Sequence, residues 1–299
     1  MYNLMINKDQ VLTIVGTESI AIEQISKQLI ENYNINIIST KQLSNNAYDV
    51  VIPSIEQDKI KELRKVFFQQ TIDCCFQSID NREKKILLSD MDATIIENET
   101  LDDLVKISGV TANIDETSRL AMEGKIDIRT TLSLRVNFLK NKPKSLIDQV
   151  LVGIKFHPGS KTLVQTLNAK GYITSLITGG FAPISTFVGN KLGFHNIVSN
   201  EFKFENDKFT GEYIPITGEK NSKLNYLNQL TAEKNIDKSQ VVAVGDGAND
   251  LGMLTNVGLG LGYHAHEIVK EQVDNQILFN DLTTILYYLG FKQEEFILD

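Results

Sequence analysis

Two short acidic motifs, each directly after an apolar run, place the strongest constraint on the fold of this chain. The sequence DMDAT (90–94) follows ILLS (86–89), and GDGAND (245–250) follows VVAV (241–244). Apolar runs of this length predict buried strands of a parallel sheet, whose ligands bind at the carboxyl ends of strands where the strand order reverses. We therefore predict that the two motifs meet in one pocket, although more than 150 residues separate them.

Such a pocket would gather the carboxylates of Asp90, Asp92, Asp246 and Asp250. Carboxylates this close repel each other unless a cation lies between them. Mg²⁺ prefers oxygen ligands and usually shares them with a substrate phosphate, so we predict a magnesium-dependent phosphoryl-transfer enzyme. A carboxylate can attack phosphorus and a second one can carry the proton, which makes Asp90 the nucleophile and Asp92 the acid/base. A solvated turn is the alternative interpretation of DMDAT.

Two further segments supply groups for a phosphate. The run ITSLIT (173–178) ends in Thr178 and Gly179, and a hydroxyl with a glycine N–H at a strand end can cradle phosphate oxygens, although a tight turn has the same pattern. Lys223, with Lys220 as the alternative, can neutralise charge in the pocket. In GDGAND the glycines allow close backbone approach, so Asp246 can reach the cation while Asp250 stands behind it.

The chain divides into an N-terminal α/β unit and a larger α/β unit. In residues 1–80 the order strand–helix–strand–strand–helix–strand predicts a ferredoxin-like domain, with strands over 11–15, 35–39, 48–52 and 72–76. A polar linker follows at 80–85, and residues 81–299 form the second domain. From residue 86 strands alternate with helices, which predicts a Rossmann-like parallel sheet, with strands over 86–89, 173–178, 196–199, 241–245 and 257–262.

The segment from about 100 to 153 contains helical patterns and little strand. The expected helices cover 101–108, 114–123, 128–139 and 144–153. An all-helical insertion directly after the first catalytic strand predicts a cap over the active site.

Composition excludes several classes of partner. The net charge of −8, with no concentrated Lys/Arg run, gives no electrostatic footprint for nucleic acid. No stretch approaches the ~20 apolar residues of a spanning helix. Residues 1–8 lack the basic start and apolar core of a signal peptide, so we expect a cytoplasmic protein without a membrane partner.

Taken in order, D-x-D-x-T, a hydroxyl-Gly-Gly turn, a lysine and G-D-G-x-N-D resemble the haloacid dehalogenase superfamily of phosphohydrolases. Within it, residues 90–101, 121–125, 178–181 and 242–250 resemble the phosphoserine phosphatase family. The resemblance covers about residues 84–290. Residues 1–80 resemble, more weakly, the ACT-like regulatory domains found ahead of some bacterial members, and they are the candidate surface for a homodimer.

The resemblance implies hydrolysis of O-phospho-L-serine to L-serine and phosphate through an aspartyl-phosphate, the last step of serine biosynthesis. It implies that Mg²⁺ is held by Asp90, the main-chain carbonyl of Asp92, and Asp246, with Asp250 supporting the metal shell. It assigns the phosphoryl group or its surroundings to Thr178, Gly179, Lys223 and Asn249. It assigns the amino acid part of the substrate to Glu99 for the ammonium, Arg135 for the carboxylate, and Met122 as a cap lining residue.

The sequence departs from the family pattern at two positions. Thr178 stands where Ser is common, which preserves the hydroxyl, and Ile128 stands where an aromatic cap residue is usual. Two alternatives remain open at this point. The chain could act on another small phosphate monoester or transfer the phosphoryl group to a second alcohol, or it could be an amino-acid-sensing protein with a retired catalytic domain. The intact carboxylates and Lys223 argue against retirement.

Overall fold

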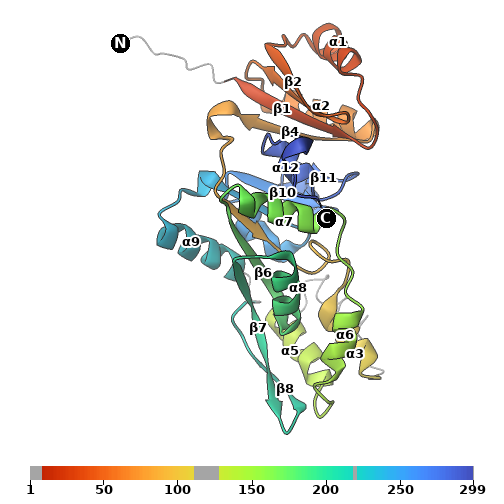
Figure 1. Ribbon diagram of the computed structural model, residues 1–299, viewed down its shortest axis with the longest axis vertical. Helices are drawn as coiled ribbons and strands as arrows, with labels where there is room; N and C mark the ends of the chain where they lie inside the picture. The colour runs from red at the N-terminus through yellow and green to blue at the C-terminus, as the bar shows by residue number, and fades with distance from the viewer. Residues whose placement is uncertain (1–8, 111–127, 218–220, 299) are drawn as a thin grey trace.

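The computed structural model describes residues 9–110, 128–217 and 221–298 (Figure 1). The N-terminal unit is a four-stranded antiparallel sheet, sheet A, with the strand order β2-β3-β1-β4. Its elements are β1 (Gln10–Gly16), α1 (Ile22–Tyr33), β2 (Ser39–Ser44), β3 (Ala47–Ile52), α2 (Gln57–Gln69) and β4 (Ile72–Ser78). This order is the predicted ferredoxin-like arrangement.

The second strand of sheet A lies further along the chain than predicted. We expected it at 35–39, but β2 covers Ser39–Ser44. Ile35 is buried in the core between the helices and the sheet, in an extended segment that follows the left-handed residue Asn34 at the end of α1. The strand lies at the edge of the sheet, and its first four residues are polar and exposed, with only Leu43 and Ser44 buried, so it lacks the apolar alternation that marks a strand.

The larger unit is built on a seven-stranded sheet, sheet B, with the order β11-β10-β9-β5-β6-β7-β8. Every neighbouring pair is parallel except β7 and β8. The strands are β5 (Ile86–Ser89), β6 (Ile173–Ala182), β7 (Asn196–Glu205), β8 (Lys208–Ile214), β9 (Val241–Gly245), β10 (Leu259–Tyr263) and β11 (Asn275–Ile277). The chain runs from β5 to one side and later returns to the other side, so the strand order reverses at β5.

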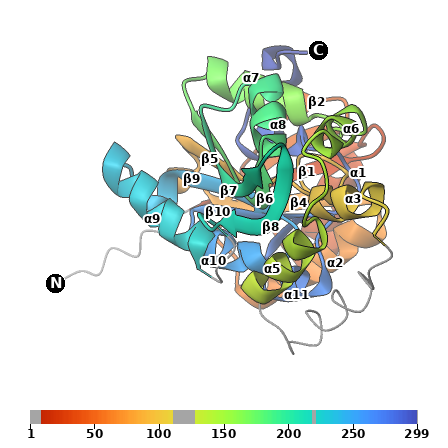
Figure 2. The same ribbon diagram turned by 90° about the horizontal axis from the view of Figure 1, so that it is seen from below.

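Helices cover both faces of sheet B, as Figure 2 shows for α9 and α10 on one side and α7 and α8 on the other. The helices are α7 (Ser160–Ala169), α8 (Ile184–Leu192), α9 (Ser222–Lys234), α10 (Leu251–Leu254), α11 (Glu267–Gln272) and α12 (Thr284–Tyr288). Short 3-10 turns lie at Ile79–Asn81 (η1), Lys238–Gln240 (η2), Ala248–Asp250 (η3) and Gln293–Glu295 (η4).

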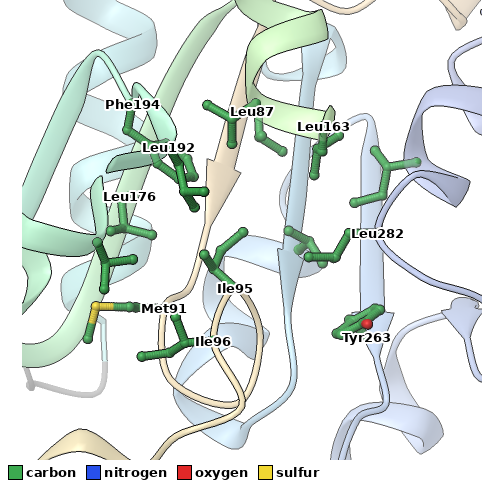
Figure 3. Packing of buried hydrophobic residues seen from close by; sticks show 14 of the residues in the cluster. Leu87, Met91, Ile95, Ile96, Leu163, Leu176, Leu192, Phe194, Tyr263 and Leu282 are labelled. Atoms are coloured by element: carbon green, nitrogen blue, oxygen red, sulfur yellow. The ribbon is translucent and has the colours of Figure 1, made fainter. Parts of the chain in front are cut away.

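Side chains of the central strands alternate between the two faces, as a strand requires. Leu87 of β5 packs in the core beneath α7 and α8, whereas Ile86 and Leu88 pack in the core beneath α9 to α11. Figure 3 shows the first of these cores, in which Leu87 comes from β5 and Met91, Ile95 and Ile96 come from the loop that follows this strand, with Leu176 on the side of Met91. The same buried cluster that supports the sheet therefore also holds the first acidic motif.

Three described helices of the insertion form the cap. They are α3 (Thr100–Ile107), α5 (Ile128–Phe138) and α6 (Leu146–Val152), which confirms the predicted positions to within two residues at each end. The helix predicted at 114–123 lies outside the described residues. The hairpin of β7 and β8, which Figure 1 shows extending from the sheet toward the cap, packs on α5 through β8.

The strand β8 was not predicted. Its turn is formed by Asn206 and Asp207, which both have positive φ (49° and 59°). Two consecutive residues with positive φ are typical of tight hairpin turns, so the Asn-Asp pair was the available signal for this hairpin.

Sheet A contacts the larger unit through the face that its helices leave open. Val15, Leu43 and Cys75 of sheet A belong to the same buried cluster as Leu286 of α12. Asp73 of β4 is buried and accepts hydrogen bonds from the backbone N–H groups of residues 278, 279 and 280, at 2.8, 3.1 and 2.9 Å. The contact between the two units is therefore both apolar and hydrogen-bonded. Within the described parts of the chain, no helix has the length and apolar character needed to cross a membrane.

Candidate active site

The two acidic motifs meet at the carboxyl ends of adjacent strands. β5 and β9 pair in parallel, with Ser89 opposite Val244. The backbone N–H of Asp90 donates to the carbonyl of Val244 (3.1 Å), which continues the pairing one residue beyond β5. Asp90 and Asp246 therefore leave the sheet side by side at the point where the strand order reverses, as the sequence predicted.

Asp90 is held by a buried lysine. The Nζ of Lys223 lies 2.8 Å from Oδ1 of Asp90 and 2.5 Å from Oδ1 of Asp250. Burial alone would lower the pKa of Lys223, but the two carboxylates outweigh it and raise this pKa, so the side chain stays charged. Lys223 thus occupies the predicted position; its alternative, Lys220, lies outside the described residues.

Both oxygens of Asp250 are used within the protein. Oδ1 binds Lys223, while Oδ2 accepts hydrogen bonds from the backbone N–H groups of Asp246 and Gly247 (3.2 and 3.0 Å). A side chain at Gly245 would overlap the carboxyl group of Asp250, so this position requires glycine. Asp250 therefore shapes the turn that presents Asp246.

Asp246 is buried beside Asp90 and accepts a hydrogen bond from the hydroxyl of Thr94 (2.9 Å). Burial, and then the charge of Asp90, raise the pKa of Asp246 to about 6. Ligand oxygens of Asp90, Asp246 and Asp250 all lie within 4.8 Å of one another. This crowding of hard oxygen ligands fits a hard divalent cation, which would remove the repulsion.

Asp92 links the strand end to the cap. Its Oδ1 accepts the backbone N–H of Thr100, in the first turn of α3 (2.8 Å), and its Oδ2 accepts the hydroxyl of Thr178 (3.3 Å). Burial raises the pKa of Asp92 to about 6. A Cβ at Gly180 would lie 3.0 Å from Oδ2 of Asp92, so the turn after Thr178 packs closely against this carboxyl group.

The groups predicted to recognise an amino acid lie on the cap side. Glu99 precedes α3 with its side chain open to solvent on one side, and partial desolvation followed by the charges of Asp92 and other nearby carboxylates raises its pKa above the ordinary value. Arg135 of α5 forms an ion pair with Asp102 of α3 (Nε to Oδ1, 3.2 Å). Asp102 also acts electrostatically on Glu99, so the three groups form one charged cluster at the cap.

The comparisons with known proteins agree with this geometry. A family model for haloacid dehalogenase-like hydrolases matches residues 87–255. The chain belongs to the haloacid dehalogenase-like hydrolase family. It is 32% identical to a phosphoserine phosphatase of Archaeoglobus fulgidus over 236 residues, which is 78% of this chain and 69% of that protein. The family resemblance inferred from the motifs is thus confirmed.

Two solved structures extend the comparison to the fold. A family hydrolase from Salmonella enterica serovar Typhi superposes with a TM-score of 0.85 at 25% identity, over 94% of this chain and 98% of that one. A phospho-aspartyl intermediate analogue of phosphoserine phosphatase superposes with a TM-score of 0.65 at 32% identity, over 69% of this chain and 99% of that one. The first likeness includes sheet A; the ACT-like character of residues 1–80 stays a prediction.

The remaining predicted residues of this hydrolase fall into two groups. Gly179 lies in the turn next to Thr178, and Asn249 lies in η3 beside Asp250. Met122 lies outside the described residues, as does the side chain of Ile128 at the start of α5. Sequence reasoning assigned no role to Thr94, although it is the last residue of DMDAT, nor to Asp102, whose only signal was its place one helical turn from Glu99.

Proposed function

We propose that this hydrolase cleaves O-phospho-L-serine to L-serine and phosphate through a phosphorylated Asp90. The observation that carries the proposal is the pairing of buried Asp90 with Lys223, next to Asp92 and Thr178 at the neighbouring strand end. A charged, water-poor site of this kind stabilises a phosphoryl group during transfer. The direct test is release of phosphate from phosphoserine by the purified chain, with and without Mg²⁺.

In the first step an oxygen of Asp90 attacks phosphorus and the bond to the serine oxygen breaks. Met91 N–H and Lys223 both contact Oδ1 of Asp90, at 2.7 and 2.8 Å, and among the described residues Oδ2 is the oxygen left for attack. Asp92 gives its proton to the departing serine oxygen and then takes one from the water that hydrolyses the acyl phosphate. A raised pKa suits Asp92 to both transfers.

The phosphoryl oxygens need positive or neutral donors. Lys223 supplies a fixed positive charge, while the hydroxyl of Thr178, the N–H of Gly179 and the amide of Asn249 supply uncharged donors. Asp90, the main-chain carbonyl of Asp92, and Asp246 would hold Mg²⁺, with Asp250 supporting Asp246 from behind. When bound, the ion would offset the charge of the carboxylates and of the phosphate.

The charged cluster of Glu99, Asp102 and Arg135 at the cap supports phosphoserine as the substrate. A guanidinium suits a carboxylate and a carboxylate suits an ammonium, so Arg135 and Glu99 match the two ends of the serine part. An ammonium beside Glu99 would also favour its charged form, which the surrounding carboxylates disfavour. A simple phosphate ester gains nothing from either group.

Replacing Arg135 with alanine should lower kcat/KM for phosphoserine by roughly 30-fold or more, because losing one partner of a desolvated charge pair costs ~2–5 kcal/mol. Activity on p-nitrophenyl phosphate, which lacks both the carboxylate and the ammonium, should change little. Steady-state kinetics on both substrates check this. Arg129→Ala is the matched control, since Arg129 lies on the same helix and is exposed. Equal losses on both substrates would show that Arg135 does not select for phosphoserine.

Removing divalent ions with EDTA should abolish turnover, and Mg²⁺ should restore it. Binding of the ion to the folded state should also raise Tm, because a ligand at 100 times its Kd stabilises by about 2.7 kcal/mol. This stabilisation should be lost in Asp246→Asn, which keeps the shape of the side chain but removes its charge. Thermal melts with and without Mg²⁺ measure it independently of activity. A Tm that rises equally in the variant would place the ion elsewhere.

A further inference from the structure

Thr178, Gly179 and Gly180 lie within β6 but do not pair with either neighbouring strand. Ile177 pairs with Val198 and Phe181 pairs with Asn200, but the register shifts between them. On the other side, pairing of β6 with β5 ends at Leu176, opposite Ser89. Residues 178–180 therefore form a bulge whose backbone groups need partners other than neighbouring strands.

Asn200 and Thr217 supply these partners. The side-chain amide of Asn200 donates to the carbonyl of Gly179 (2.9 Å), and its Oδ1 accepts the backbone N–H groups of Ile216 and Thr217 (2.9 and 2.8 Å). The hydroxyl of Thr217 donates to the carbonyl of Thr178 (2.5 Å). Asn200 and Thr217 are 0% and 3% exposed, so water does not compete for these bonds. We call these two side chains the clasp.

The clasp fixes the direction of the N–H groups in the bulge. In a planar trans peptide the C=O and the N–H point in opposite directions. Because Thr217 holds the carbonyl of Thr178, the N–H of Gly179 must point away from Thr217. Because Asn200 holds the carbonyl of Gly179, the N–H of Gly180 must point away from Asn200. It donates to the hydroxyl oxygen of Thr178 (2.8 Å).

The hydrogen bond from the Gly180 N–H also orients the side chain of Thr178. Its hydroxyl oxygen accepts from Gly180, so its own hydrogen is free to point to Asp92, 3.3 Å away, or to a phosphoryl oxygen in its place. The clasp thus aims two donors, the Gly179 N–H and the Thr178 hydroxyl, and the four hydrogen bonds of its side chains given above all join backbone atoms. Among side chains of this length, only asparagine carries both the amide donor and the carbonyl acceptor that position 200 needs; glutamine has the same groups on a longer side chain.

We infer that Asn200 and Thr217 are positioning residues, which aim the phosphate-binding donors of Thr178 and Gly179. The inference rests on the proposed role of these two residues in binding the phosphoryl group. It predicts that a substitution in the clasp lowers kcat/KM both for phosphoserine and for a phosphate ester that lacks the serine part. This pattern is the opposite of the one expected for Arg135.

Thr217→Val removes the hydroxyl and keeps the shape of the side chain. It should lower kcat/KM about 10-fold or more for both phosphoserine and p-nitrophenyl phosphate, because small misplacements of oriented donors are costly. It should also weaken competitive inhibition by inorganic phosphate. Thr217→Ser, which restores the hydroxyl, should recover most of the activity. Thr231→Val is the matched control, since the buried hydroxyl of Thr231 likewise donates to a backbone carbonyl, that of Leu227 (2.8 Å).

Unchanged kinetics and phosphate inhibition in a folded Thr217→Val would overturn the inference, as would a loss confined to phosphoserine. If that variant does not fold, the wild type still decides. Adding inorganic phosphate with Mg²⁺ should shift the NMR amide signal of Gly179, and an unmoved signal contradicts the inference. Because p-nitrophenyl phosphate and inorganic phosphate report on the phosphoryl site alone, these readouts hold even if phosphoserine proves not to be the substrate.

Discussion

Asp90→Asn is expected to abolish phosphate release and to block formation of the covalent intermediate. An amide is a poor nucleophile, whereas the carboxylate of Asp90 leaves the sheet next to Lys223 with one oxygen ready to attack. The substitution keeps the side-chain volume and relieves repulsion with Asp246, so the fold should survive it. Phosphate release, together with beryllium fluoride trapping, measures the effect. In the wild type, the trapped group should be on Asp90 alone.

A suitable control is Asp148→Asn, because Asp148 is an exposed aspartate on α6 in the cap. Its turnover and trapping should match the wild type. Thermal melts of both variants separate loss of chemistry from loss of fold. Activity near that of the wild type in a folded Asp90→Asn would mean that the nucleophile is another group, and the proposed mechanism would fail.

The residues at the strand ends could be predicted because local sequence determines their surroundings. DMDAT and GDGAND each follow a short apolar run, and adjacent parallel strands bring their carboxyl ends to one edge. The requirement for glycine at position 245 is also local, since Asp250 folds back over it within the same turn. These short-range relations made Asp90, Asp246 and Asp250 visible without a structure.

Other parts of the site depend on contacts that sequence patterns do not record. From the sequence Lys223 is the choice and Lys220 a plausible competitor, and the observed burial of Lys223 between two carboxylates supports that choice. Asn200 and Thr217 look like ordinary polar residues of a strand and a loop, and their role depends on a bulge in β6. The pairing of Asp102 with Arg135 joins two cap helices whose packing no local pattern encodes.

Asp92→Asn is expected to reduce turnover of phosphoserine by ~10²–10⁴-fold, the usual contribution of general acid–base catalysis. Asparagine can still accept the N–H of Thr100 through its oxygen, so the attachment of α3 to the active site should be retained. The variant therefore tests proton transfer rather than cap position. A p-nitrophenolate leaving group needs little protonation, so formation of the phosphoenzyme should be partly rescued with p-nitrophenyl phosphate.

Hydrolysis of that phosphoenzyme should not be rescued, because the attacking water still lacks its base. Asp92→Asn should accordingly release a rapid burst of p-nitrophenolate followed by slow turnover, and acid quenching should recover more phosphoenzyme than from the wild type. Phosphoserine should give no burst, since its alkoxide leaving group depends on the missing proton. The contrast between the two substrates isolates the acid step, and the slow phase isolates the base step. If phosphoenzyme formation falls equally with both substrates, Asp92 does not act as the acid, and its contribution lies in holding Thr178 and the start of α3 in place.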